Sequence, residues 1–146
     1  MKSLERGVSA GKITERERDG AVSKLTFTTD LKDLADRQLV IEAVIEDEAV
    51  KAGIFAELDG VVTDADAVLA SNTSSIPIMK LAAATKNPQR VLGLHFFQPN
   101  PVPVLPLVEL VCTLVTDGAA PERTEQFASG CSANKWCAAL TGRASW

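Results

Sequence analysis

Short apolar runs alternate with amphipathic stretches along the middle of the chain, and this pattern predicts strands that alternate with helices. The run QLVIEAVI at 38–45 is nearly continuous in apolar residues, which is typical of a parallel strand covered on both faces. The alternation in KLTFTT, rich in β-branched residues, predicts a strand at 24–29. Apolar runs predict further strands at 68–71, 90–97 and 107–115.

Helices are predicted in the segments between these runs. Residues 47–59 place Val50, Ile54 and Leu58 on one face, at the spacing of an amphipathic helix. The T-x-x-E pattern at 14–17 is a capping box, which predicts a helix that continues to about residue 24. Further helices are expected at 3–11, 76–84 and 121–129.

Strands that alternate with helices indicate βαβ units, and therefore an α/β fold with a parallel sheet. In such sheets, ligands bind at the carboxyl ends of the strands. The polar stretches SNTSS at 71–75 and HFFQP at 95–99 both fall at the ends of predicted strands. We therefore expect them at the functional edge of the sheet, although the hydroxyls of 71–75 can also cap the helix that follows.

Composition and charge narrow the class of protein. The 146 residues suffice for one domain with a hydrophobic core, and the net charge of −4 gives no reason to expect a nucleic acid or an anionic membrane as partner. No apolar run approaches the roughly 20 residues of a membrane span, and the charged N-terminus lacks the apolar core of a secretion signal. We therefore expect a cytoplasmic protein. The three cysteines and the single histidine match no zinc spacing, so no metal site is predicted.

The segment 131–146, CSANKWCAALTGRASW, shows neither helical nor strand periodicity and holds both tryptophans and two of the three cysteines. A GC-rich back-translation of this segment, read one nucleotide over, encodes a plausible strand and turn. We therefore divide the chain into a domain at 1–130 and an irregular tail at 131–146. The tail is either frameshifted, which is our hypothesis, or a genuine irregular terminus.

Four motifs taken together resemble one known family: LVIEAVIEDEAVKAGIFAELD, ASNTSS, LGLHFFQP and PLVELV. In this order and at this spacing they are similar to the NAD-dependent L-3-hydroxyacyl-CoA dehydrogenases, which include the bacterial 3-hydroxybutyryl-CoA dehydrogenases. The resemblance runs from about residue 1 to residue 130. It implies a Rossmann-type domain followed by a helical domain that forms the dimer, with NAD as the cofactor and an acyl-CoA as the substrate.

The resemblance assigns this chain to the later part of the Rossmann-type domain. The glycine-rich turn G-x-G-x-x-G, which holds the pyrophosphate of the cofactor, is expected upstream of Met1. The glycines at 7, 11 and 20 follow no predicted strand and do not form that turn. The predicted fold is therefore an incomplete, doubly wound parallel sheet that lacks the first βαβ unit and the helical C-terminal domain.

His95, Glu109 and Ser74 are the candidate catalytic residues. Oxidation of a secondary alcohol needs a base for the hydroxyl proton, and an imidazole suits that role, so the resemblance makes His95 the general base. Glu109 lies in an otherwise apolar strand, where an unpaired carboxylate is costly, and the resemblance pairs it with the histidine. Ser74 matches a serine that binds the 3-oxygen of the substrate. The alternative for His95 is a histidine at the end of a strand that hydrogen-bonds only to backbone groups. The alternative for Glu109 is a solvated glutamate on an edge strand.

The resemblance also implies contacts with the cofactor and with CoA. Asn72 matches a residue near the nicotinamide, and Glu46 and Lys51 match positions that contact the ribose and phosphate region. The alternative for Glu46 and Lys51 is a surface pair of little consequence. Ser3 and Lys12 lie where the family binds the CoA portion, although a charged helix of this kind is usually a solvated face.

One stretch departs from the family pattern. The family usually reads HFFNPVPV-x-x-LVE, whereas this chain reads HFFQPNPVPVLPLVE, as if Gln98 and Pro99 were inserted. Either Gln98 replaces the expected asparagine, or Asn100 is that asparagine displaced, and Asn100 is assigned to the cofactor site. The insertion falls between His95 and Glu109, so it threatens to move the two side chains out of hydrogen-bonding reach.

The most specific function that these residues imply is the NAD-dependent oxidation of an (S)-3-hydroxyacyl-CoA, such as 3-hydroxybutyryl-CoA, to the 3-oxoacyl-CoA in fatty-acid metabolism. The alternative is an inactive remnant, or a non-enzymatic interaction fragment, of such an enzyme. A sheet without its first strands leaves an open edge, through which the chain can pair with another copy of itself. A related dehydrogenase of other 3-hydroxyacids is a weaker alternative, because the HFFxP stretch resembles the acyl-CoA group most.

Overall fold

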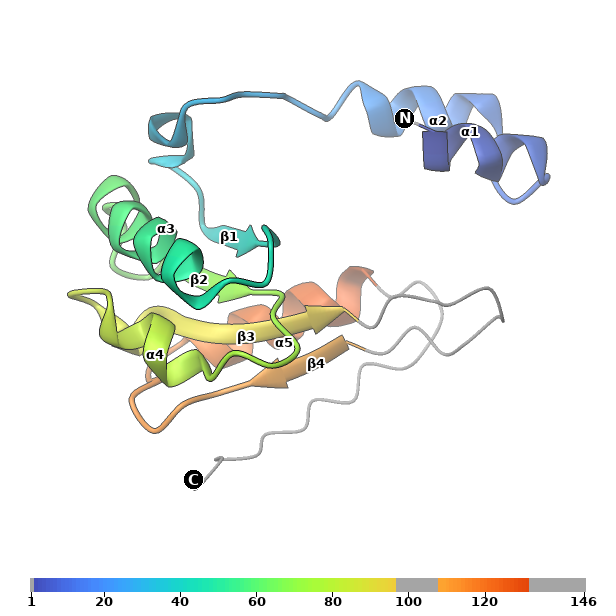
Figure 1. Ribbon diagram of the computed structural model, residues 1–146. Helices are drawn as coiled ribbons and strands as arrows, with labels where there is room; N and C mark the ends of the chain where they lie inside the picture. Colours follow the sequence, from blue (N-terminus) through green and yellow to red (C-terminus); the bar gives the residue numbers. More distant parts are fainter. Residues whose placement is uncertain (1, 97–107, 132–146) are drawn as a thin grey trace. The chain divides into compact units, whose positions relative to one another are not determined.

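The computed structural model describes residues 2–96 and 108–131 of the chain. Two units are distinguished by their internal packing, Met1–Asp30 and Leu31–Trp146. The second unit contains the sheet and most of the predicted site residues (Figure 1). Within the described residues, none of the helices is long and apolar enough to cross a membrane.

Two short helices form the first unit, α1 at Lys2–Ser9 and α2 at Glu15–Val22. The predicted capping box is confirmed: the Thr14 N–H donates to Glu17 Oε2 at 2.7 Å, and the Glu17 N–H donates to Thr14 Oγ1 at 3.2 Å. Between the helices, Gly11 has a φ of +66°, a conformation that side chains rarely adopt. The helix predictions for this part of the chain are therefore correct.

The predicted strand at 24–29 is wrong. Leu25 and Phe27 are 52% and 82% exposed, and no strand of the described chain pairs with this segment. Alternation shows that a segment fits the surface of a sheet, but a strand also needs a neighbour to satisfy its backbone N–H and C=O groups. The segment therefore has a strand pattern without a partner strand among the described residues.

Four strands form one sheet in the order β1-β2-β3-β4, at Leu39–Glu42, Val68–Ser71, Val91–Phe96 and Val108–Val111. Parallel pairing of β1 with β2 and of β2 with β3 confirms the predicted α/β fold. The prediction of an entirely parallel sheet is wrong for β4, which runs antiparallel to β3. A parallel return needs a crossover of about a dozen residues or more, and only 97–107 lie between these two strands.

Helices cover both faces of the sheet, as a doubly wound fold requires (Figure 1). One face is covered by α3 at Glu48–Val61, by α4 at Ile78–Ala83 and by the 3₁₀ turn η1 at Leu31–Leu34. The other face is covered by α5 at Ala120–Cys131, and a second 3₁₀ turn, η2 at Pro88–Arg90, leads into β3. The predicted helices of this unit are therefore confirmed within a few residues of their expected ends.

Alternate strand residues divide between two hydrophobic clusters, one on each face of the sheet. The cluster under α3 and α4 includes Phe55, Leu58, Leu69, Leu81 and Val91. The cluster under α5 includes Val68, Leu92, Leu94, Leu110 and Ala128. The predicted face of α3 is partly wrong, because Val50 is 41% exposed whereas Phe55, one position beyond Ile54, is fully buried.

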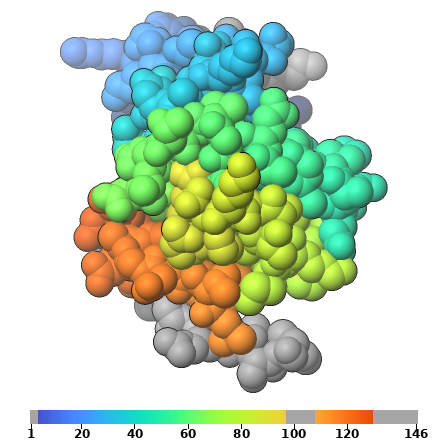
Figure 2. Space-filling model, turned by 90° about the vertical axis from the view of Figure 1, so that its left-hand side faces the viewer, coloured from blue at the N-terminus to red at the C-terminus, as the bar shows by residue number. Residues whose placement is uncertain are grey.

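A buried ion pair fixes the end of the sheet at which the strands begin. Arg90 Nη2 lies 2.9 Å from Asp59 Oδ1, and Arg90 Nη1 donates to the Asp64 carbonyl at 2.8 Å. Burial by itself raises the pKa of Asp59, but hydrogen bonds from Arg90, the Lys86 N–H and Asn87 lower it below its ordinary value. Figure 2 shows the molecule from one side, with yellow surface between green and orange surface.

Gly93 lies where β3 packs closely against both β4 and α4. A Cβ atom at this position would lie 3.0 Å from Val111 Cβ and 3.1 Å from two side-chain carbons of Ile78. Gly93↔Val111 is a directly opposed pair in the antiparallel ladder, so neither neighbour can move away without disturbing the sheet. The sequence LGLHF therefore needs glycine here for packing.

We predict that Gly93→Ala lowers the free energy of unfolding by about 1–3 kcal/mol, because the new methyl group overpacks the core. Urea denaturation followed by circular dichroism measures the change. Gly60→Ala is the matched control, because Gly60 is exposed on α3 and no atom lies within 4 Å of an added Cβ. We expect this variant to raise the free energy of unfolding by up to about 1 kcal/mol. An unchanged unfolding midpoint for Gly93→Ala would contradict the packing argument.

Candidate functional site

Polar side chains gather at the edge of the sheet where β1, β2 and β3 end and β4 begins. Glu42 is the last residue of β1, Ser71 is the last residue of β2, and His95 is the penultimate residue of β3. Parallel pairing brings the carboxyl ends of β1, β2 and β3 to the same side, and antiparallel pairing brings the start of β4 there. This edge is where an α/β sheet ordinarily binds its ligand.

His95 and Glu109 face each other across the β3–β4 ladder. They are a directly opposed pair, with His95 Nδ1 3.5 Å from Glu109 Oε2, and their side chains are 17% and 33% exposed. This separation is within ion-pair range for a protonated imidazole and longer than a strong hydrogen bond. The structure thus brings the two predicted residues within ion-pair range, although the stretch between them departs from the family pattern. Gln98, Pro99 and Asn100 lie outside the described residues.

A buried ion pair joins β1 to α3 beside this edge. Lys51 Nζ lies 2.6 Å from Glu42 Oε1, and both side chains are almost fully buried. The same Glu42 oxygen accepts from the Val44 N–H at 2.6 Å, and Glu42 Oε2 accepts from Ser71 Oγ at 2.6 Å. Our sequence reasoning missed Glu42 and Ser71. The signal was available, since Glu42 is a carboxylate inside an apolar run, as Glu109 is.

Glu46 is the outward-facing acid of this group, with a side chain that is 41% exposed. It accepts hydrogen bonds from the hydroxyls of Thr73 and Ser75, the latter at 2.9 Å, and its Oε2 lies 3.4 Å from Lys51 Nζ. The hydrogen bond from Thr73 is the largest cause that lowers the pKa of Glu46, to about 2. Glu46 is therefore ionised at any ordinary pH. Its carboxylate is held by the hydroxyls of Thr73 and Ser75 and by the ammonium of Lys51.

The SNTSS stretch bonds to strand-end acids and to backbone rather than to the helix that follows. Asn72 Oδ1 accepts from the Phe96 N–H at 2.8 Å, so Asn72 ties the end of β2 to the end of β3. Thr73 Oγ1 accepts from the Ile76 N–H at 3.0 Å and shapes the turn. The alternative of a helix cap is wrong for α4, whose N-cap Pro77 makes no side-chain hydrogen bond. Ser74 is exposed at the surface of the stretch.

Two predicted residues belong to the first unit. Ser3 lies in α1, with its side chain outside the described part, and Lys12 is exposed after α1. Their predicted contact with CoA is therefore still a prediction.

The described edge fits one part of NAD better than another. Glu46 offers an exposed carboxylate acceptor, which suits the hydroxyls of a ribose. Lys51 is only 1% exposed and its ammonium already contacts Glu42, Glu46 and the Val44 carbonyl, which does not fit the expected direct contact with phosphate. The N-terminus of α3 is capped by the Asp47 carboxylate, which disfavours an anion there. The described edge therefore fits the nucleoside part of NAD better than its phosphates.

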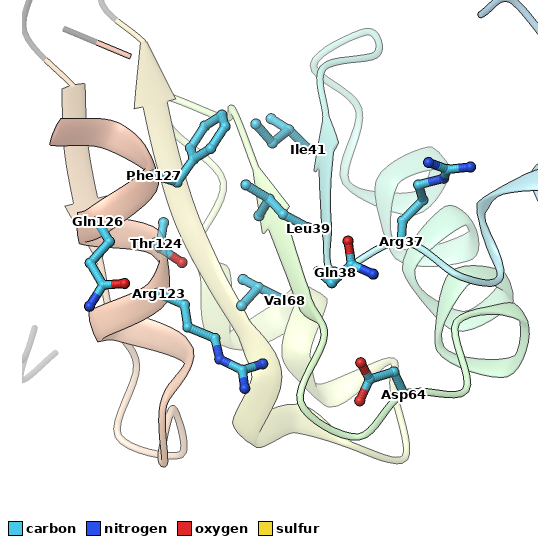
Figure 3. Close-up of a pocket in the computed structure, with 10 residues that line it drawn as sticks. All are labelled: Arg37, Gln38, Leu39, Ile41, Asp64, Val68, Arg123, Thr124, Gln126 and Phe127. Carbon is cyan, nitrogen blue, oxygen red and sulfur yellow. The ribbon is translucent and has the colours of Figure 1, made fainter. Parts of the chain in front are cut away.

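A cavity of about 790 Å³ lies away from these residues, between α5 and the beginnings of β1 and β2. Figure 3 shows Phe127 of α5 directed toward Leu39 and Ile41 of β1, with Val68 at the floor and Arg123 at the rim. Its apolar lining comes from Leu39, Ile41, Val68 and Phe127. None of the predicted site residues that the structure describes lines this cavity, so it is a surface beside β1 and not part of the candidate site.

Comparison with known proteins gives one consistent result. The sequence profile of a family described as "3-hydroxyacyl-CoA dehydrogenase, NAD binding domain" matches residues 1–136. The chain is 82% identical over 129 residues to a 3-hydroxybutyryl-CoA dehydrogenase of Mycobacterium tuberculosis, covering 88% of this chain and 44% of that protein. It is 46% identical over 125 residues to a 3-hydroxybutyryl-CoA dehydrogenase of Bradyrhizobium diazoefficiens, covering 86% and 42%. The chain thus spans less than half the length of these relatives.

Solved structures agree. The crystal structure of M. tuberculosis FadB2 matches with a TM-score of 0.88 and 76% sequence identity, over 97% of this chain and 49% of that chain. The (S)-3-hydroxybutyryl-CoA dehydrogenase from Ralstonia eutropha matches with a TM-score of 0.82 and 36% identity, over 97% and 48%. The chain therefore shares its fold with these solved structures.

We predict that Glu46→Gln flattens the acid dependence of stability. Glu46 has a folded-state pKa of about 2 against an ordinary 4.5, so its ionised form stabilises the fold above about pH 4.5, and this contribution is lost as the pH falls toward 2. Urea midpoints measured between about pH 5 and pH 3 should fall less steeply in Glu46→Gln than in the parent chain. The control is Glu57→Gln, an exposed carboxylate on α3, which should keep the parent slope.

Proposed function

Because the chain belongs to the 3-hydroxyacyl-CoA dehydrogenase family, we propose that it serves the oxidation of an (S)-3-hydroxyacyl-CoA, such as 3-hydroxybutyryl-CoA, to the 3-oxoacyl-CoA with NAD. The pairing of His95 with Glu109 at the ligand-binding edge of the sheet carries this proposal. Two relatives named 3-hydroxybutyryl-CoA dehydrogenase support the substrate class. The proposed setting is fatty-acid metabolism in the cytoplasm, without a nucleic-acid or membrane partner.

His95 acts as the general base in this proposal. Its imidazole accepts the proton of the substrate hydroxyl. Bound NAD would supply the acceptor for the hydride of the same carbon. Glu109 Oε2, 3.5 Å from Nδ1, stabilises the imidazolium that results and orients the ring so that Nε2 faces the substrate. Glu109 is thus a positioning residue, whereas His95 touches the reacting atoms.

Ser74, Asn72 and Glu46 complete the site on the β2 side. The exposed hydroxyl of Ser74 donates a hydrogen bond to the 3-oxygen of the substrate, which polarises it in the reverse reaction. Asn72 holds the ends of β2 and β3 together through the Phe96 N–H, and its amide lies on the proposed nicotinamide side. Glu46 accepts hydrogen bonds from ribose hydroxyls. Asn100, Ser3 and Lys12 keep their proposed roles toward cofactor and CoA.

A second proposal follows from the open edge of β1. β1 is paired only with β2 among the described strands, and an apolar cavity lies beside it. An unpaired strand edge next to apolar side chains is a template for pairing with another chain. The second candidate function is therefore that of an interaction fragment without activity of its own, which forms a homo-oligomer through this edge.

The enzymatic proposal is tested with the purified chain, acetoacetyl-CoA and NADH. We expect NADH consumption that falls by about 10²–10⁴-fold in His95→Ala, because the general base is lost. Glu109→Gln should also lower the rate and shift its pH profile, since the imidazolium loses its partner. Gly60→Ala, distant from the edge, should leave the rate unchanged. If the chain neither consumes NADH nor binds it in calorimetry, the enzymatic proposal is refuted and only the interaction-fragment proposal stands.

The edge-pairing proposal predicts concentration-dependent association in sedimentation equilibrium. Ile41→Lys places a charge on the open strand and beside the apolar cavity, so it should shift the chain toward the monomer. Val50→Lys makes the same chemical change on α3, where Val50 is 41% exposed, and should leave the association unchanged. A parent chain that is monomeric at all accessible concentrations would refute the proposal.

A further inference from the structure

The carboxylate of Glu42 accepts hydrogen bonds from Lys51, from Ser71 and from the Val44 N–H, and both Lys51 and the stretch that begins at Ser71 contact Glu46. We propose that Glu42 is a positioning residue, whose buried carboxylate sets the geometry of the 71–76 turn and of Glu46 through Lys51 and Ser71. This inference rests on the proposed function of that edge as the cofactor and substrate site. Glu42 itself is 5% exposed, so the proposed role is exerted through its neighbours and not by direct contact.

The first path runs through Lys51. Glu42 Oε1 lies 2.6 Å from Lys51 Nζ, and the same nitrogen lies 3.4 Å from Glu46 Oε2. A lysine with four carbons of flexible chain has many rotamers, and a buried carboxylate selects the one that aims the ammonium at Glu46. The Val44 carbonyl, at 3.3 Å, is the third acceptor for this ammonium. Glu42 therefore determines where the positive charge behind Glu46 lies.

The second path runs through the SNTSS stretch. Glu42 Oε2 accepts from Ser71 Oγ at 2.6 Å, and Ser71 Oγ in turn accepts from the Thr73 N–H at 3.3 Å. The Thr73 hydroxyl donates to Glu46 and accepts from the Ile76 N–H. The backbone carbonyl of Glu42 adds a bond from the Asn72 N–H at 2.8 Å. The turn that carries Ser74 is thus fastened to Glu42 at successive residues.

A purely structural role is the competing explanation, and the fold supplies its comparison. Asp59 is a second buried carboxylate, 9% exposed, which pairs with buried Arg90. Its contacts lie at the opposite end of the sheet, where the strands begin. Removal of either charge takes the nearest carboxylate away from a buried cation, so both variants should be less stable than the parent chain. Only removal of the Glu42 charge should change the turn and Glu46.

The test is nuclear magnetic resonance of the full chain with Glu42→Gln and with Asp59→Asn. In Glu42→Gln we expect shifted amide signals at Thr73 and Ile76, and about tenfold faster hydrogen exchange at Thr73 than in the parent chain. The titration of the Glu46 carboxyl carbon should move to higher pH, because its donors are no longer held in place. In Asp59→Asn the amide signals of Thr73 and Ile76 and the titration of Glu46 should be unchanged, while the urea midpoint of unfolding falls.

Unchanged turn signals and an unchanged Glu46 titration in folded Glu42→Gln would overturn the proposal. If Glu42→Gln does not fold, Ser71→Ala keeps the ion pair and removes only the second path. It should still shift the Thr73 signal and the Glu46 titration, and no change there would equally overturn the proposal. The measurement uses no cofactor or substrate, so it tests the coupling between Glu42 and Glu46 independently of enzymatic activity. An inactive chain can still show this coupling, and an active chain can still lack it.

Discussion

The contact between Glu42 and Lys51 is the interaction on which the candidate site depends. It joins the last residue of β1 to α3 in the interior, and Ser71 joins the same carboxylate to the end of β2. Two charges removed from water are stable only when their remaining hydrogen-bonding capacity is filled, and here the Val44 backbone and Glu46 fill it. The polar edge of the sheet is therefore built outward from a buried pair.

Much of the fold could be predicted from the sequence, because apolar runs and amphipathic stretches report burial directly. The short runs at 68–71 and 90–97 became β2 and β3 nearly as expected, and Asp47 is the N-cap of α3. The strand at 24–29 failed because alternation cannot reveal whether a partner strand exists. The direction of β4 failed because direction depends on the connection, which apolar content does not encode.

The candidate site was only partly predictable for a related reason. His95 and Glu109 stand out as an imidazole and a carboxylate in apolar strands, and the ladder places them opposite each other. The distribution of the SNTSS hydroxyls between Glu42 and Glu46 could not be deduced from spacing, since it depends on which carboxylates the pairing of β1 and β2 brings near. The burial of Lys51 was not predicted, because a lysine side chain is ordinarily exposed to solvent.

The antiparallel pairing of β3 and β4 has a consequence for how this part of the chain can change over evolution. The distance between His95 and Glu109 is set by the ladder between two strands and not by the number of residues that connect them. Any change in the connection that keeps the register of the ladder therefore leaves the acid and the imidazole opposite each other. A shift of β4 by one residue would instead turn Glu109 to the other face of the sheet.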